Sequence, residues 1–137
     1  MAQTQTVTNE GITELVKCCS GGTATGVKSV CCLTDSTPCT AAITSTYASP
    51  ADTKCTDSGF ELADADTVTQ STTNTTGDTI EVDHVFTASG SKNVTGVIIC
   101  NDDDDVNVME TCFNAVLPME SSDTITYEGK IVFDQTA

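Results

Sequence analysis

The sequence alternates apolar and polar residues most regularly in two segments, 79–88 and 124–133. A two-residue period places alternate side chains on opposite faces of a strand, so both segments are predicted to be β-strands. One face carries Ile80, Val82, His84 and Phe86 in the first segment, and Ile125, Tyr127, Ile131 and Phe133 in the second. The charged residues Glu81, Asp83, Glu128 and Lys130 fall on the other faces. Each strand should therefore cover a core with one face only.

Further strand signals divide the chain at intervals typical of an all-β protein. Residues 27–33, 94–100 and 106–117 are rich in β-branched or apolar side chains, and residues 60–72 alternate weakly. Turn residues separate them at Asn74–Gly77, at Gly90, and from Pro118 to Asp123. We expect a mainly β protein, an antiparallel β-sandwich with its main strands in 60–134. No repeat or linker divides the chain, so residues 1–137 should form one domain.

A short helix is predicted near residues 9–19. Asn9 is a suitable N-cap, and Ile12, Leu15, Val16 and Cys19 recur at helical spacing. Gly21 and Gly22 follow as a stop signal. The helix should be amphipathic and pack beside the sandwich.

Residues 34–59 contain much Thr, Ser, Ala, Pro and Asp and little periodicity. We expect a long surface loop here, and loops of this length are usually functional or poorly ordered.

The charge of the chain excludes two classes of partner. Twenty acidic residues stand against five lysines, which gives a net charge of −15. Nucleic acids and anionic membranes are bound through cationic side chains, so neither is expected as a partner. No stretch approaches the about 20 apolar residues that a membrane-spanning helix needs.

The eight cysteines are the most unusual feature of the composition. The disulfide candidates are Cys18, Cys19, Cys31, Cys32, Cys39, Cys55, Cys100 and Cys112. They allow about 105 full pairings, so the sequence does not give the connectivity. We expect a mixture of bridges within and between chains. Cys39 and Cys55, in the loop, are the interchain candidates, whereas a cysteine in a strand, such as Cys112, is more often simply a buried small apolar side chain.

Metal-binding and catalytic patterns are sparse. The cysteines lack C-x-x-C spacing, and the single histidine, His84, falls on the apolar face of a strand, as a hydrogen-bonded core residue would. The run Asp102, Asp103, Asp104 and Asp105 is a weak Ca²⁺ candidate without EF-hand spacing, and a solvated charged turn is the alternative reading. We expect no cofactor, no metal and no enzymatic activity, because the chain has neither a phosphate-binding glycine loop nor a G-x-S-x-G nucleophile.

Several motifs resemble one known family when they are read in order. The chain has TNEG at 8–11, DTIEVDHVFTASGS at 78–91, NVTGVII at 93–99 and SSDTITYEGKIVF at 121–133. In this order they resemble a family of small structural proteins of tailed bacteriophages, described as virion structural, decoration or tail-fibre-related proteins. The cysteines and the run of aspartates at 102–105 depart from the family pattern. No catalytic residue comes with the resemblance.

The resemblance implies a protein made in the host bacterial cytoplasm and located in the virion. Its partners would be the major capsid protein or neighbouring virion proteins, together with other copies of itself. The N-terminus lacks the features of an export signal, and a virion protein needs none, because lysis releases thiols into an oxidising medium. The favoured expectation is a capsid decoration or linking protein. The alternatives are a neck, collar or tail component, including a fibre attachment, and a secreted cysteine-rich binding module.

Overall fold

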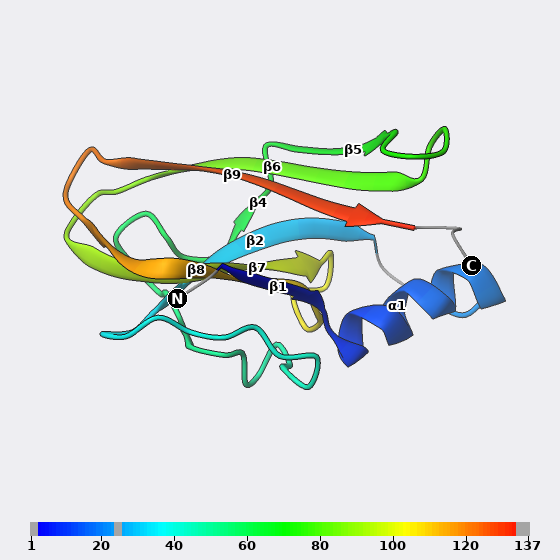
Figure 1. The fold of residues 1–137 in the computed structure, drawn as a ribbon, viewed down its shortest axis with the longest axis horizontal. Coiled ribbons are helices and arrows are strands. Elements are labelled where there is room, and N and C mark those ends of the chain that lie inside the picture. Colours follow the sequence, from blue (N-terminus) through cyan, green and yellow to red (C-terminus); the bar gives the residue numbers. More distant parts are fainter. Residues whose placement is uncertain (1–2, 24–25, 134–137) are drawn as a thin grey trace.

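The computed structural model describes residues 3–23 and 26–133 and shows the predicted β-sandwich with one short helix (Figure 1). The larger sheet contains β1 (Thr4–Val7), β2 (Val27–Thr34), β3 (Thr53–Lys54), β4 (Ala63–Asp64), β7 (Lys92–Asn101) and β8 (Asn107–Met119). The smaller sheet contains β5 (Thr67–Ser71), β6 (Thr79–Thr87) and β9 (Thr124–Val132). The helix α1 spans Asn9–Ser20. All strand pairs are antiparallel.

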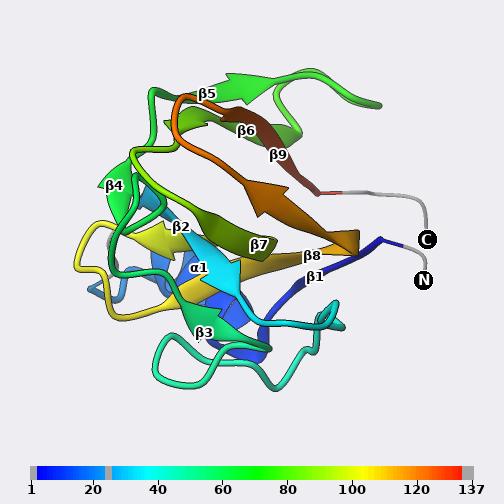
Figure 2. The same cartoon turned by 90° about the vertical axis from the view of Figure 1, so that its left-hand side faces the viewer.

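The two sheets lie face to face, with the strand order β1-β8-β7-β2-β3 in the larger sheet and β5-β6-β9 in the smaller one (Figure 2). The strand β4 pairs with β2 beside this path. The alternation of β6 is confirmed, because Val82 and Phe86 are buried between the sheets. Phe133 does not share the buried face of β9. It follows the last residue of that strand and is about half exposed.

The larger sheet is buried on both faces. Its inner face meets the smaller sheet through residues such as Val30, Val97 and Ile99, and its outer face carries Leu33 and Ile98 in a second apolar cluster. A strand covered on both faces needs apolar residues at every position. This double burial explains why the sequence at 30–33 and 97–100 reads as uninterrupted apolar runs.

The outer face of the larger sheet is covered by the segment that the sequence predicted to be a long surface loop. Residues 35–52, here called the covering loop, lie across the outer face of the larger sheet (Figures 1 and 2). The side chain of Glu110 in β8, fully buried, accepts hydrogen bonds from Ala42 N (3.2 Å), Ala51 N (2.8 Å) and Ser45 Oγ (2.8 Å). A buried carboxylate therefore supplies the hydrogen bonds that an irregular segment cannot make with itself.

The helix spans nearly the predicted residues, but its cap lies one residue earlier than the sequence indicates. Its N-cap is Thr8, whose hydroxyl oxygen accepts a hydrogen bond from Gly11 N (3.0 Å), and Asn9 is the first helical residue. Gly11 faces β8 so closely that a Cβ there would lie 2.2 Å from Val108 O. Gly11 and Glu14 are the buried residues of α1. The helix consequently rests on the sheet through a glycine and a carboxylate, and much of its apolar side is left open.

Candidate interaction site

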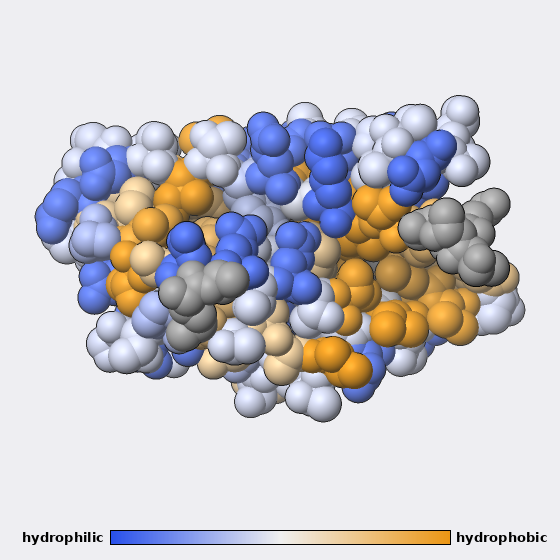
Figure 3. All heavy atoms as spheres, in the orientation of Figure 1, coloured by the Kyte–Doolittle hydropathy of each residue, from blue (hydrophilic) through white to orange (hydrophobic). Residues whose placement is uncertain are grey.

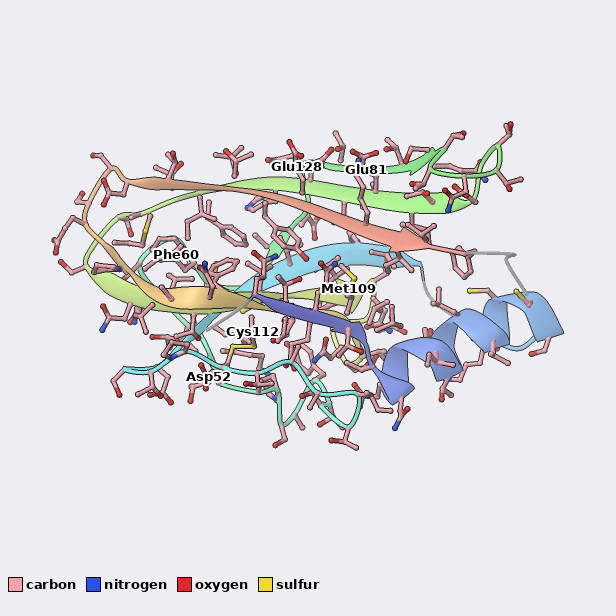
Figure 4. The ribbon with its side chains drawn as sticks, viewed as in Figure 1. Asp52, Phe60, Glu81, Met109, Cys112 and Glu128 are labelled. Carbon is pink, nitrogen blue, oxygen red and sulfur yellow. A yellow bond between two sulfur atoms is a disulfide. The ribbon has the colours of Figure 1, made fainter. Side chains whose placement is uncertain are left out.

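The structure corrects the expected role of Cys39. Its sulfur is bonded to that of Cys112 within the same chain, with the two Cα atoms 5.4 Å apart. The bond fastens the start of the covering loop to β8, and Cys112 lies on the loop side of the larger sheet, whereas Phe60 lies between the sheets (Figure 4). The prediction of Cys39 as an interchain cysteine was therefore wrong, because the loop that carries it packs against the sheet.

Cys55 is not an exposed loop residue either. It is 3% exposed and belongs to the core between the sheets. Cys31, Cys32 and Cys100 are also buried free thiols. Burial raises the pKa of Cys31 to about 12 and that of Cys55 to about 11, and it raises the pKa values of Cys32 and Cys100 as well. These thiols stay protonated at neutral pH and are poor nucleophiles.

Cys18 and Cys19 are the two exposed thiols of the chain, and they lie next to each other in the last turn of α1. All eight cysteines lie within the described residues, so the contrast is complete: two sulfurs share a disulfide, four thiols are buried, and two face solvent. Sequence spacing placed Cys19 on the apolar side of the helix, but it gave no sign that this side is uncovered.

An apolar groove adjoins these thiols. Ile12, Leu15, Val16, Cys19, Ser20 and Phe133 line it. Ile12 is 50% exposed, Val16 57% and Phe133 49%, which is unusual for side chains of this size. Figure 3 shows apolar side chains gathered over the part of the molecule where α1 lies. We call this surface the helix groove.

A second apolar hollow lies on the other side of the helix, between α1 and the strands. Cys18 lines it together with Leu15, Val27, Val68 and Ile80. Leu15 borders both hollows, so the two adjacent cysteines open to either side of one apolar ridge. The end of α1 thus combines the accessible thiols with the open apolar surface of the described chain.

The carboxylates of the turn between β7 and β8 have different partners and do not converge on one point. Asp102 lies 2.8 Å from Lys28 Nζ, and Asp105 accepts a hydrogen bond from the side chain of Asn101 (2.8 Å). The side-chain oxygen of Asn101 in turn accepts from the backbone N–H groups of Asp105 and Val106. Over residues 3–23 and 26–133, no group of three or more His, Cys, Asp or Glu side chains is arranged to hold a metal ion.

His84 lies between a carboxylate and an aromatic ring. Its Nδ1 lies 3.3 Å from a carboxylate oxygen of Asp66, and its ring meets Phe86 edge-on with centroids 4.5 Å apart. None of the hydrogen bonds found among the described residues joins it to a cysteine. The histidine belongs to the packing of β6, and the Cys–His pair of a cysteine nucleophile is not formed there.

The search for membrane-spanning helices and the comparison with known proteins were both negative. Within the described ranges, no helix is long and apolar enough to cross a membrane. Comparison of the chain with protein-family models, with curated proteins and with solved structures gave no match.

Proposed function

We propose that this chain is a non-enzymatic structural protein of a tailed-phage virion, in which it decorates or links capsid subunits and is crosslinked to neighbouring copies by disulfides. One observation carries the crosslinking part of this proposal: Cys18 and Cys19 are exposed beside an open apolar groove, whereas every other cysteine is buried or bonded. The assignment to a virion rests on the resemblance of the sequence motifs.

The chemistry suits a particle that assembles inside a cell and is then released. The cytosol keeps thiols reduced, so copies can be placed without premature crosslinks. After lysis, two neighbouring thiols form one disulfide and pass two electrons and two protons to dissolved oxygen, which becomes hydrogen peroxide. The exposed thiols of α1 are free to react in this way with a neighbouring copy, whereas the buried thiols are out of reach of another chain.

The occupant we assign to the helix groove is a second copy of this chain. The exposed apolar side chains of the groove are few. The area they could bury is far smaller than the about 800 Å² that each partner buries in a stable interface. The charge of −15 on each copy adds repulsion. A non-covalent contact would be weak, so a covalent bond must hold it. In a two-fold symmetric contact both partners use the same surface. A second copy would therefore place its own apolar groove and its own pair of thiols against those of the first.

The outer face of the smaller sheet suits the side of the particle that faces solvent. Glu81 and Glu128 lie on that face and point away from the larger sheet (Figure 4). Carboxylates there would keep neighbouring particles apart through electrostatic repulsion.

The test is gel electrophoresis of intact particles in SDS with and without reductant, followed by mass spectrometry of crosslinked peptides. We expect a ladder that collapses on reduction, with Cys18 or Cys19 in the linked peptides. Peptides shared with the capsid protein support decoration, and peptides shared with neck or tail proteins would overturn it in favour of that location. Monomer alone in both lanes would overturn the crosslinking mechanism.

A further inference from the structure

Two of the buried thiols face each other where the covering loop returns to the larger sheet. In the antiparallel pairing of β2 with β3, Leu33 lies opposite Lys54 and Thr34 opposite Thr53. One step further along the same register places Cys32 opposite Cys55. The backbone confirms this placement, because Cys55 N donates a hydrogen bond to Cys32 O (2.8 Å).

The side chains of this pair point to the same side of the sheet. Leu33 belongs to the outer cluster, and its neighbour Cys32 belongs with Cys55 to the core between the sheets. The pKa of the Cys32 thiol is raised first by burial and next by the Cys55 thiol. Both thiols are free.

The spacing of opposed residues suits a disulfide. Directly opposite residues of an antiparallel pair have Cα atoms about 4.5–5.5 Å apart, and disulfides span about 4.4–6.8 Å. The bonded pair Cys39 and Cys112 lies at 5.4 Å by the same measure. We propose that Cys32 and Cys55 form a second intrachain disulfide when the protein passes from reducing to oxidising surroundings.

The oxidant is a small disulfide of the glutathione type. The Cys55 thiolate attacks one sulfur of the oxidant, forms a mixed disulfide and releases one small thiolate. The Cys32 thiolate then attacks the Cys55 sulfur and releases the second small thiolate. The protein loses two electrons and two protons, and the two small thiolates take up the protons. Because burial keeps both thiols protonated, the reaction needs an opening of the loop and is slow.

The bond would complete the attachment of the covering loop. Cys39 and Cys112 already fix its first part, and a bond from Cys32 to Cys55 would fix the segment where it ends. The competing pair of Cys31 with Cys55 is less well placed. Cys31 belongs to the outer cluster, and its sulfur faces the backbone oxygen of Cys55 at 3.6 Å. This inference rests on the fold and is independent of the proposed role in a virion.

The test uses the full chain with Cys18→Ser and Cys19→Ser, which removes the exposed thiols and leaves four free buried ones. After incubation with oxidised glutathione, the protein is denatured, alkylated and digested for mass spectrometry. We expect two alkylated cysteines, Cys31 and Cys100, a peptide linking Cys32 to Cys55, and a higher melting temperature. A Cys31→Ser control should still lose two thiols, and Cys55→Ala should lose none.

Persistence of four free thiols would overturn the proposal, and so would a bond from Cys31 to Cys55 or to Cys100. Because the peptide map is made without altering the core, a poorly folding core variant does not obscure the answer. Failure here would leave crosslinking through Cys18 and Cys19 untouched, since that is measured in the wild-type chain.

Discussion

Two apolar surfaces lie outside the central core, the outer face of the larger sheet and the apolar side of α1, and they differ in how far they are covered. The outer face of the larger sheet is covered by the chain's own loop, which is fastened by one disulfide and by the buried Glu110 carboxylate. Among residues 3–23 and 26–133 the apolar side of α1 has no such cover, and Ile12 and Val16 are about half exposed. Cysteines follow the same division, buried or bonded on the first surface and exposed on the second. The covered surface contributes to folding, and we propose that the open one contacts a second copy of the chain.

The largest difference should appear in thiol reactivity. When the protein is purified with mild reductant and treated with iodoacetamide, Cys18 and Cys19 should react at once. Cys31 and Cys100, beneath the covering loop, should react at least about 1,000-fold more slowly, because labelling requires both opening of the fold and loss of a proton. Time-resolved mass spectrometry measures this ratio. Comparable rates at all free cysteines would remove the distinction between the two surfaces.

Loss of the disulfide should have the next largest effect. The bond joins residues 73 positions apart, and the chain-entropy argument assigns a loop of that length about 4 kcal/mol. Cys39→Ala with Cys112→Ala should lower the free energy of unfolding by about this amount in urea titrations. The matched control, Cys18→Ala with Cys19→Ala, should change it by less than about 0.5 kcal/mol. Equal losses would mean that the exposed pair is structural as well.

The carboxylate under the loop can be tested by a nearly isosteric change. Glu110→Gln puts an NH₂ group where one oxygen now accepts hydrogen bonds from the loop. We expect a loss of about 2–3 kcal/mol, since hydrogen bonds to buried charged groups are among the stronger ones. Glu128→Gln, on the exposed face of β9, serves as the control and should be nearly neutral. Thermal or chemical denaturation measures both, and a neutral Glu110→Gln would show that the loop is held otherwise.

The smallest expected difference is in the stability cost of the same substitution, Ile to Val, on the two surfaces. Ile98 is fully buried beneath the covering loop, and Ile12 is half exposed on α1. Ile98→Val should cost about 1 kcal/mol of stability, whereas Ile12→Val should stay within about 0.5 kcal/mol. Equal costs in urea denaturation would indicate that the isolated chain already covers the helix groove.

The sequence predicts those parts of the fold that local pattern determines. The strands β6 and β9 were predicted because each has one buried and one exposed face, which produces clear alternation. The strand β1 was missed, since its four residues are mostly Thr and Gln and pair only with β8. The order of the covering loop was also missed, because it depends on Glu110 and Cys112, which lie far along the chain. A single glutamate within the otherwise uncharged strand β8 is the signal that could have revealed it.

The site was predicted in part. The helix and its row of apolar residues could be read from spacing, but spacing does not say which side meets the sheet. That side is decided by Gly11, where only the absence of a Cβ lets α1 approach Val108. The same contact turns Cys19 outward, so the choice of interchain cysteines could not come from the sequence.

The central claim is that Cys18 and Cys19 are the residues that link one copy to another. The direct measurement is oxidation of the purified chain at rising concentration, followed by non-reducing gel electrophoresis, for wild type and for Cys18→Ser with Cys19→Ser. The account predicts a dimer band in the wild type that reductant abolishes and that the variant lacks. A wild type that remains monomeric, or a variant that crosslinks equally well, would contradict it.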